Sequence, residues 1–141
     1  MKEKDTVTLQ DELRSTECLE QFVEENKEEL QTKTVPEFLE ELLEKYDRKK
    51  AEVAKRAGLD ESYNYQIFMG KRNAKRDKLI QIAFGFPLTV EETQQLLRCG
   101  EYSELYVRRK RDAYLMYALE KGYDVWQVNE LLFEKGVEAF E

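Results

Sequence analysis

The chain of 141 residues carries 23 Lys and Arg against 30 Asp and Glu, so its formal net charge is -7. It has no histidine and only two cysteines, so neither a histidine-based catalytic site nor a zinc site is expected, and we predict no enzymatic activity, no metal and no cofactor. It has neither an apolar run of about 18 residues nor the apolar middle of a signal peptide, so we expect a cytoplasmic protein that does not bind membranes.

The charge is unevenly distributed along the chain. Residues 1–45 hold 6 basic and 14 acidic side chains, a net charge of -8, whereas residues 48–76 hold 9 basic and 3 acidic side chains, a net charge of +6. A local positive field attracts phosphate even on a negative molecule. The sequence therefore predicts a basic surface on residues 48–76; the alternative is that these groups are only solvated.

Residues 1–33 form an acidic N-terminal extension. Apolar residues recur between Leu9 and Leu30, and Ser15 and Thr16 interrupt them. This pattern predicts a short helix near 8–14 and a longer one near 16–30. The acidic face either serves solubility or forms a docking or autoinhibitory surface that covers the basic residues.

The next predicted helix begins after residue 34. Thr34-Val35-Pro36-Glu37 has the pattern of a capping box, in which the threonine accepts a backbone hydrogen bond and the glutamate reaches back. The helix then carries a stripe of apolar residues: Phe38, Leu39, Leu42, Leu43 and Tyr46.

Residues 49–73 predict two short helices around a tight turn. Val53, Ala54 and Ala57 share one face of a helix over 51–57, which Gly58 ends. Asp60 or Ser62 caps a second helix over about 61–69. Gly70 ends that helix and is followed at once by Lys71, Arg72 and Asn73.

This stretch resembles the helix-turn-helix domain of the Xre/Cro/CI-like regulator family. The matching residues are Ala54, Gly58, Leu59, Ser62, Ile67, the run Gly70-Lys71-Arg72-Asn73, then Leu79, Ile82, Ala83 and the run Leu88-Thr89-Val90-Glu91-Glu92. The resemblance covers residues 35–99. It implies a five-helix core whose third helix, over 61–69, lies in the major groove of double-stranded DNA.

The outward face of this recognition helix is predicted to meet base edges with Glu61, Ser62, Tyr65 and Gln66. Gln66 can bond N6 and N7 of adenine together, and Glu61 can accept from N4 of cytosine. Glu61 also repels phosphate, so it helps only where a donor base faces it. Asn64 lies on the inward face, where the family usually has an apolar residue, so we expect its amide to be hydrogen-bonded or partly exposed.

Five residues are predicted to face phosphate: Lys50, Tyr63, Lys71, Arg72 and Asn73. Lys50 begins the second helix of the resemblance, and a helix N-terminus favours phosphate oxygens. Tyr63 could instead touch a thymine methyl group. Phosphate contacts supply affinity and register but carry no sequence information.

The remaining chain predicts four more elements. Leu79, Ile80, Ile82 and Ala83 predict a buried helix over about 76–85, and Thr89-x-x-Glu92 is a second capping box for a helix that stops at Gly100. A C-terminal extension follows. Apolar residues all round 113–119 predict a helix enclosed by others, and Asp124 with Gln127 predicts the cap of a last helix.

Two features of the C-terminal extension leave alternatives open. Its aromatic residues form either a plain core or a dimer interface. The basic cluster at 108–111 is either a second phosphate contact, or it pairs with the acidic N-terminal helices or is simply solvated.

The sequence as a whole predicts an all-α fold of about seven helices, with a five-helix core over 34–100 and extensions over 1–33 and 101–141 packed on it as one globular unit. The predicted function is sequence-specific binding of double-stranded DNA as a transcriptional regulator, with a homodimer on two half-sites. The alternative is an adaptor or inhibitor that keeps the fold without binding DNA and uses the acidic N-terminal or aromatic C-terminal helices for a protein partner.

Overall fold

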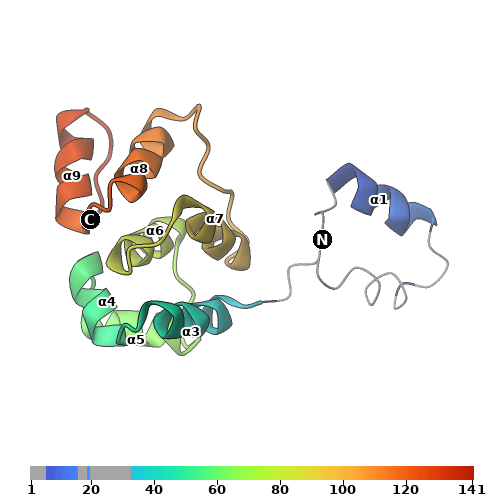
Figure 1. Ribbon diagram of the computed structural model, residues 1–141, viewed down its shortest axis with the longest axis horizontal. Coiled ribbons are helices and arrows are strands. Elements are labelled where there is room, and N and C mark those ends of the chain that lie inside the picture. The colour runs from blue at the N-terminus through green and yellow to red at the C-terminus, as the bar shows by residue number, and fades with distance from the viewer. Residues whose placement is uncertain (1–5, 16–18, 20–32) are drawn as a thin grey trace. The chain divides into compact units, whose positions relative to one another are not determined.

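The computed structural model describes residues 6–15, 19 and 33–141, and the chain divides into two units, residues 1–32 and 33–141. In the first unit, helix α1 (Thr6–Ser15) covers the short helix predicted near 8–14. The helix predicted near 16–30 lies outside the described residues. The described residues contain eight helices and no strand, which confirms the all-α prediction (Figure 1).

Residues 33–141 hold seven of these helices: α3 (Val35–Tyr46), α4 (Lys50–Ala57), α5 (Glu61–Phe68), α6 (Arg76–Gly85), α7 (Val90–Cys99), α8 (Lys110–Glu120) and α9 (Val125–Glu134). Helix α4 packs on α5 and α6, α3 packs on α5 and α7, and α8 and α9 pack on each other and on α7 and α6. Within the described residues, no helix has the length and apolar character needed to cross a membrane.

Three of the helices begin with a capping box, as the sequence predicted. The first residue of each box accepts from the backbone N–H three residues later: Thr34 from Glu37 at 3.3 Å, Thr89 from Glu92 at 3.1 Å and Asp124 from Gln127 at 2.9 Å. These local bonds fix where α3, α7 and α9 start.

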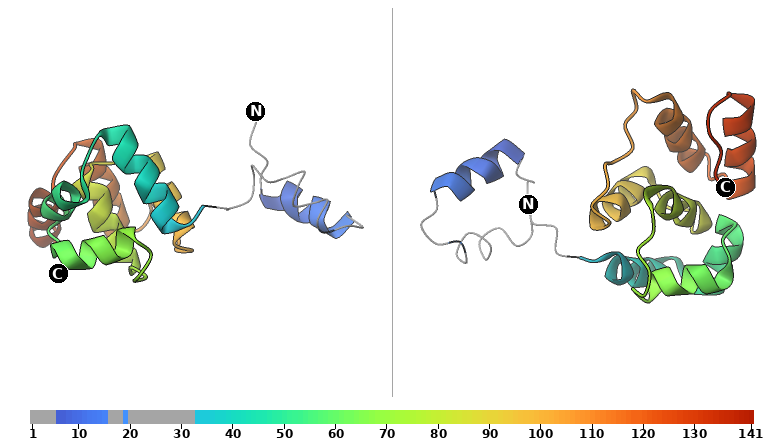
Figure 2. Two further views of the ribbon diagram at one scale, coloured as in Figure 1. Left: turned by 90° about the horizontal axis from the view of Figure 1, so that it is seen from below. Right: turned by 180° about the vertical axis from the view of Figure 1, so that it is seen from behind.

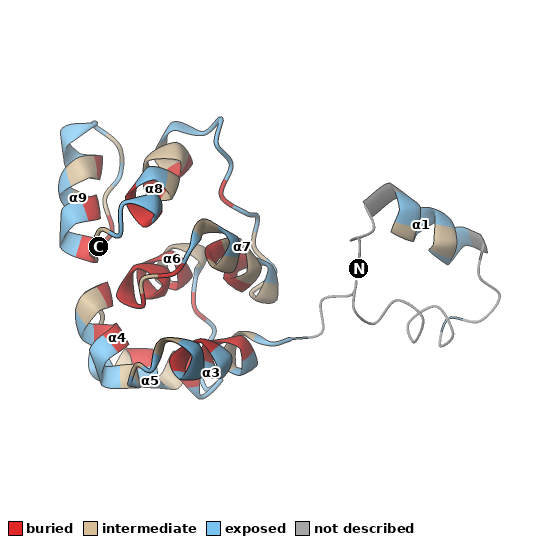
Figure 3. Cartoon of the chain, in the orientation of Figure 1, coloured by how far each residue is buried: buried red, intermediate tan, exposed pale blue. Residues whose placement is uncertain are grey.

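Helix α6 lies at the centre of the unit. Every residue from Leu79 to Gly85 is buried, and Figure 3 draws a large part of α6 in the buried colour. A Cβ atom added at Gly85 would lie 2.6 Å from the carbonyl oxygen of Val53, so the glycine allows α4 to approach α6 closely. This contact positions the helix pair α4–α5 on the core.

The C-terminal extension completes the core but also exposes aromatic side chains. On α8, Leu115 and Leu119 are buried whereas Tyr117 is 49% exposed, so the prediction of a fully enclosed helix was wrong at that edge. On α9, Trp126 is 58% and Phe133 is 82% exposed. The alternative of a plain core therefore fails at these two positions, where more than half of each side chain is exposed in the described unit.

Candidate nucleic-acid interface

Helices α4 and α5 are joined by a short turn at residues 58–60. Gly58 adopts a left-handed conformation with φ 69°, and the N–H of Leu59 donates to the carbonyl oxygen of Ala54 at 3.0 Å. A Cβ atom at Gly58 would lie 3.0 Å from Cγ1 of Val125 on α9. The C-terminal extension thus supports the turn that sets the relative position of α4 and α5.

Helix α5 has one inward and one outward face. Its N-cap Asp60 accepts from the N–H of Tyr63 at 3.0 Å, and Ile67 and Phe68 are buried. The four residues predicted to face bases lie on the outward side: Glu61, Ser62 and Tyr65 are exposed and Gln66 is half-buried. Figures 1 and 2 show α5 at the outside of the unit formed by residues 33–141.

The inward face contains one buried polar residue, Asn64. Its Nδ2 donates to the carbonyl oxygen of Lys50 at 3.1 Å, so the expected hydrogen bond is present. Its Oδ1 is buried and accepts no hydrogen bond from any described residue. Asn64 therefore ties α5 to the first residue of α4 rather than contributing to the outward surface.

The chain reverses direction at the end of α5. Gly70 is left-handed with φ 75°, its N–H donates to the oxygen of Ile67 at 3.1 Å, and the N–H of Lys71 donates to the oxygen of Gln66 at 2.9 Å. This pair of bonds is the Schellman arrangement that closes many helices. It turns Lys71 and Arg72 back alongside the last turn of α5.

The reversal brings residues of the two predicted sets into contact. Nε of Arg72 donates to Oε1 of Gln66 at 3.0 Å, and the guanidinium lies 5.3 Å from the ring centroid of Tyr63. Nζ of Lys71 lies 5.9 Å from the ring centroid of Tyr65. We define the α5 surface by the residues that the outward side of α5 and this turn present together: Glu61, Ser62, Tyr63, Tyr65, Gln66, Lys71, Arg72 and Asn73.

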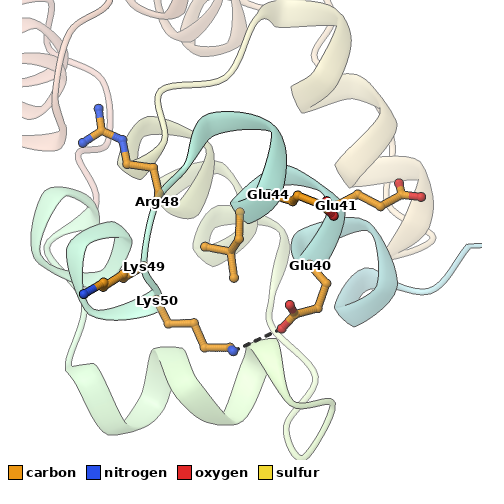
Figure 4. A pocket seen from close by; sticks show the side chains of 7 residues that line it. Glu40, Glu41, Glu44, Arg48, Lys49 and Lys50 are labelled. Atoms are coloured by element: carbon orange, nitrogen blue, oxygen red, sulfur yellow. Dashed lines mark ion pairs between the residues drawn. The ribbon is translucent and has the colours of Figure 1, made fainter.

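Lys50, a predicted phosphate contact, already has a carboxylate partner. Its Nζ lies 3.1 Å from Oε1 of Glu40, across a hollow between α3 and α4 in which Arg48 and Lys49 point away from Glu40 (Figure 4). Lys50 also lines a second hollow together with Ser62 and Tyr65. It therefore borders the α5 surface, but a phosphate would have to displace Glu40 to bind it.

The basic residues of the 48–76 stretch differ in their partners, and besides Lys50 with Glu40, Arg48 pairs with Glu52 at 3.7 Å. Lys71, Arg72 and Lys75 are exposed and make no ion pair with any carboxylate in the described part of the chain. Arg76 instead pairs with Asp112 on α8 at 3.2 Å. Sequence reasoning missed this structural ion pair, because Asp112 lies 36 residues away from Arg76 and no local pattern indicates it.

The residues of the predicted cluster at 108–111 differ in the same way. Arg111 donates to both carboxylate oxygens of Asp77 at 2.9 and 3.0 Å, so it is a structural residue and its partner is on α6. The side chains of Arg108, Arg109 and Lys110 are exposed and hydrogen-bond to nothing in the described residues.

Residues 6–15, 19 and 33–141 contain no group of three or more His, Cys, Asp and Glu side chains that could hold a metal ion. Comparisons with protein-family models, with curated proteins and with solved structures gave no match. The likeness to Xre/Cro/CI-like regulators therefore rests on the motif residues alone.

Proposed function

We propose that this protein binds double-stranded DNA with sequence specificity through α5, and that it acts as a transcriptional regulator. One observation carries the proposal: within residues 33–141 the side chains on the outward side of α5 are exposed or half-buried, and the segment between α5 and α6 carries three exposed cations, Lys71, Arg72 and Lys75, that have no carboxylate partner among the described residues. Cations without a carboxylate partner, next to an exposed helix face, are what contacts with phosphate and a DNA groove require.

The α5 surface suits a major groove. The groove of B-DNA is about 12 Å wide and admits one α-helix. With α5 in the groove, Glu61, Ser62, Tyr65 and Gln66 would face base edges, and the polar side chains of the turn after Gly70 would lie beside a phosphate strand. Two copies of the chain would read half-sites about 34 Å apart.

The test is the salt dependence of binding to a random-sequence duplex. The double variant Lys71→Ala/Lys75→Ala should bind more weakly at ~50 mM salt, and the slope of log K against log salt should become shallower by about 0.9 for each phosphate that the variant no longer neutralises. The matched control is Lys121→Ala/Lys135→Ala, which removes the same charge from exposed positions at the ends of α8 and α9.

The control should retain the slope of the unchanged protein. Equal weakening in both double variants would show that only the overall charge matters, and the assignment of phosphate contacts to the segment between α5 and α6 would then be wrong. Fluorescence anisotropy with a labelled duplex measures all three proteins under the same conditions.

A second candidate function, a protein-interaction module, is favoured by the exposed aromatic side chains of α9. Trp126 and Phe133 lie two helical turns apart on one side of α9, and exposed Glu130 lies between them. Large exposed aromatic groups are typical of protein interfaces. Absence of any duplex binding at ~50 mM salt would favour this function, since phosphate contacts dominate binding at low salt.

A further inference from the structure

The hydrogen bond between Arg72 and Gln66 fixes the orientation of the Gln66 amide. Arginine carries only N–H donors, so the Gln66 atom that lies 3.0 Å from Nε of Arg72 must be the carbonyl oxygen. The amide NH2 group of Gln66 then points away from Arg72. This assignment follows from the chemistry of the partner and leaves no choice between the two amide orientations.

Arg72 is itself held in place. Its guanidinium lies 5.3 Å from the ring centroid of Tyr63, a cation–π contact, and the turn at Gly70 brings its backbone alongside α5. Because Tyr63 and Gln66 lie on neighbouring turns of the same helix, the three side chains form one connected group. Gln66 is thus oriented before any ligand arrives, which reduces the entropy lost on binding.

This orientation changes what Gln66 can read. Adenine presents an acceptor, N7, and a donor, the N6 amino group, so an amide must offer both a donor and an acceptor to it. Guanine presents two acceptors, N7 and O6. An amide whose oxygen already accepts from a guanidinium becomes a stronger donor and has less capacity left to accept. The held Gln66 therefore matches guanine better than adenine.

We propose that Arg72 sets the base preference of Gln66, so that the base pair facing Gln66 is read through guanine rather than adenine. This inference rests on the proposed binding of duplex DNA by α5. It makes Arg72 a positioning residue whose Nε acts through Gln66, while its Nη groups remain available to a phosphate.

The experiment is a selection of bound sites from random duplexes, made with the unchanged protein and with Arg72→Ala. The base pair at which the two selections differ is then made either G·C or A·T in two otherwise identical duplexes. The ratio of their dissociation constants gives the preference. The unchanged protein should prefer guanine by about 10-fold, the discrimination typical of a good base contact, and Arg72→Ala should shift the preference to adenine.

Two controls separate positioning from charge. Lys71→Ala removes one charge from the neighbouring residue, so it should weaken binding to both duplexes equally and keep the preference for guanine. Tyr63→Phe keeps the ring under the guanidinium and should keep the preference, whereas Tyr63→Ala should reduce it. Urea unfolding of each variant confirms that it is folded.

The outcomes distinguish the role of Arg72 from the proposed binding of duplex DNA. Failure of the unchanged protein to bind any duplex overturns both. Binding with a guanine preference that Arg72→Ala leaves intact, or a preference of the unchanged protein for adenine, overturns the role of Arg72 alone. Those results would leave the proposal of DNA binding standing.

Discussion

At the residue scale, Asn64 is a polar side chain on the buried face of α5. It is fully buried, its Nδ2 donates to the oxygen of Lys50, and its Oδ1 has no partner among the described residues. A buried oxygen without a partner costs free energy that the single hydrogen bond only partly offsets. The net contribution of the amide to stability is therefore small.

We predict unequal effects on stability for two substitutions of similar size at this position. Asn64→Asp places a carboxylate against the carbonyl oxygen of Lys50 and should lower the free energy of unfolding by about 3 kcal/mol at pH 7. Asn64→Leu removes both the bond and the unpaired oxygen and should change it by about 1 kcal/mol or less. Urea unfolding measures both, and a leucine variant less stable than the aspartate variant would contradict this account.

The sequence placed these residues on the correct faces but did not identify their partners. The helical period alone puts Asn64 inward and Gln66 outward. The bond from Arg72 to Gln66 depends on the backbone reversal at Gly70, and the bond from Asn64 to Lys50 depends on how α5 packs on α4. Sequence spacing carries no information on either, so the predicted adenine contact of Gln66 was based on a free amide.

At the scale of elements, Glu92 joins α7 to α3. It closes the capping box of α7, and it accepts from Nζ of Lys45 at 2.6 Å and from the hydroxyl of Tyr46. Burial alone would raise the pKa of Glu92, but the hydrogen bonds from Lys45, Thr89 and Tyr46 together lower its pKa below the ordinary value. Burial and the Glu92 carboxylate raise the pKa of Tyr46 to about 12.

These pKa shifts predict how stability depends on pH. A carboxyl group whose pKa is lower in the folded state stabilises the fold above its unfolded pKa, and this contribution is lost as the pH falls through the folded pKa. Glu92→Gln should therefore be less stable than the unchanged protein by about 1–2 kcal/mol at pH 7. The difference should shrink as the pH falls below about 4.

Glu91→Gln is the matched control. Glu91 is the residue next to Glu92, and its side chain is exposed and makes no ion pair in the described residues. It should unfold like the unchanged protein at every pH. Thermal unfolding between acid and neutral pH checks the prediction, and a Glu92→Gln deficit that stays constant with pH would refute the assigned role of its charge.

The two functions of Glu92 differ in how visible they are in the sequence. Its role in the capping box depends on Thr89, three residues away, and was predicted. Its contacts with Lys45 and Tyr46 could not be predicted, because these partners precede Glu92 by 47 and 46 positions in the sequence, respectively. The starts and ends of the helices were likewise predictable from local sequence. Which side of α9 is exposed was not, because that depends on how the other helices pack against it.

At the scale of the molecule, two reciprocal ion pairs attach the C-terminal extension to α6. Arg76 and Asp77 of α6 pair with Asp112 and Arg111 of α8, respectively. Asp112 is 3% exposed and also accepts from the N–H of Tyr106. Because α6 is buried from Leu79 to Gly85, residues 101–141 complete the core around it. The apolar pattern of α6 predicted its burial but not what covers it.

Arg111 tests how strongly the end of the chain depends on this attachment. Besides its two bonds to Asp77, its Nε donates to the carbonyl oxygen of Glu138 at 2.7 Å, and its guanidinium lies 5.2 Å from the ring centroid of Phe140. Phe140 is buried and lies 6.2 Å, centroid to centroid, from Phe84 on α6. Arg111 thus holds the last residues of the chain against the central helix.

Arg111→Ala should lower the free energy of unfolding by about 2 kcal/mol, because it removes these hydrogen bonds and leaves Asp77 without its partner. Arg108→Ala removes the same side chain three residues earlier, where it is exposed and makes no ion pair in the described residues, and should change stability by less than about 0.5 kcal/mol. Urea unfolding followed by circular dichroism measures both. Similar stability in the two variants would mean that residues 136–141 contribute little to the core. The proposed attachment of these residues to α6 through Arg111 would then not stabilise the fold.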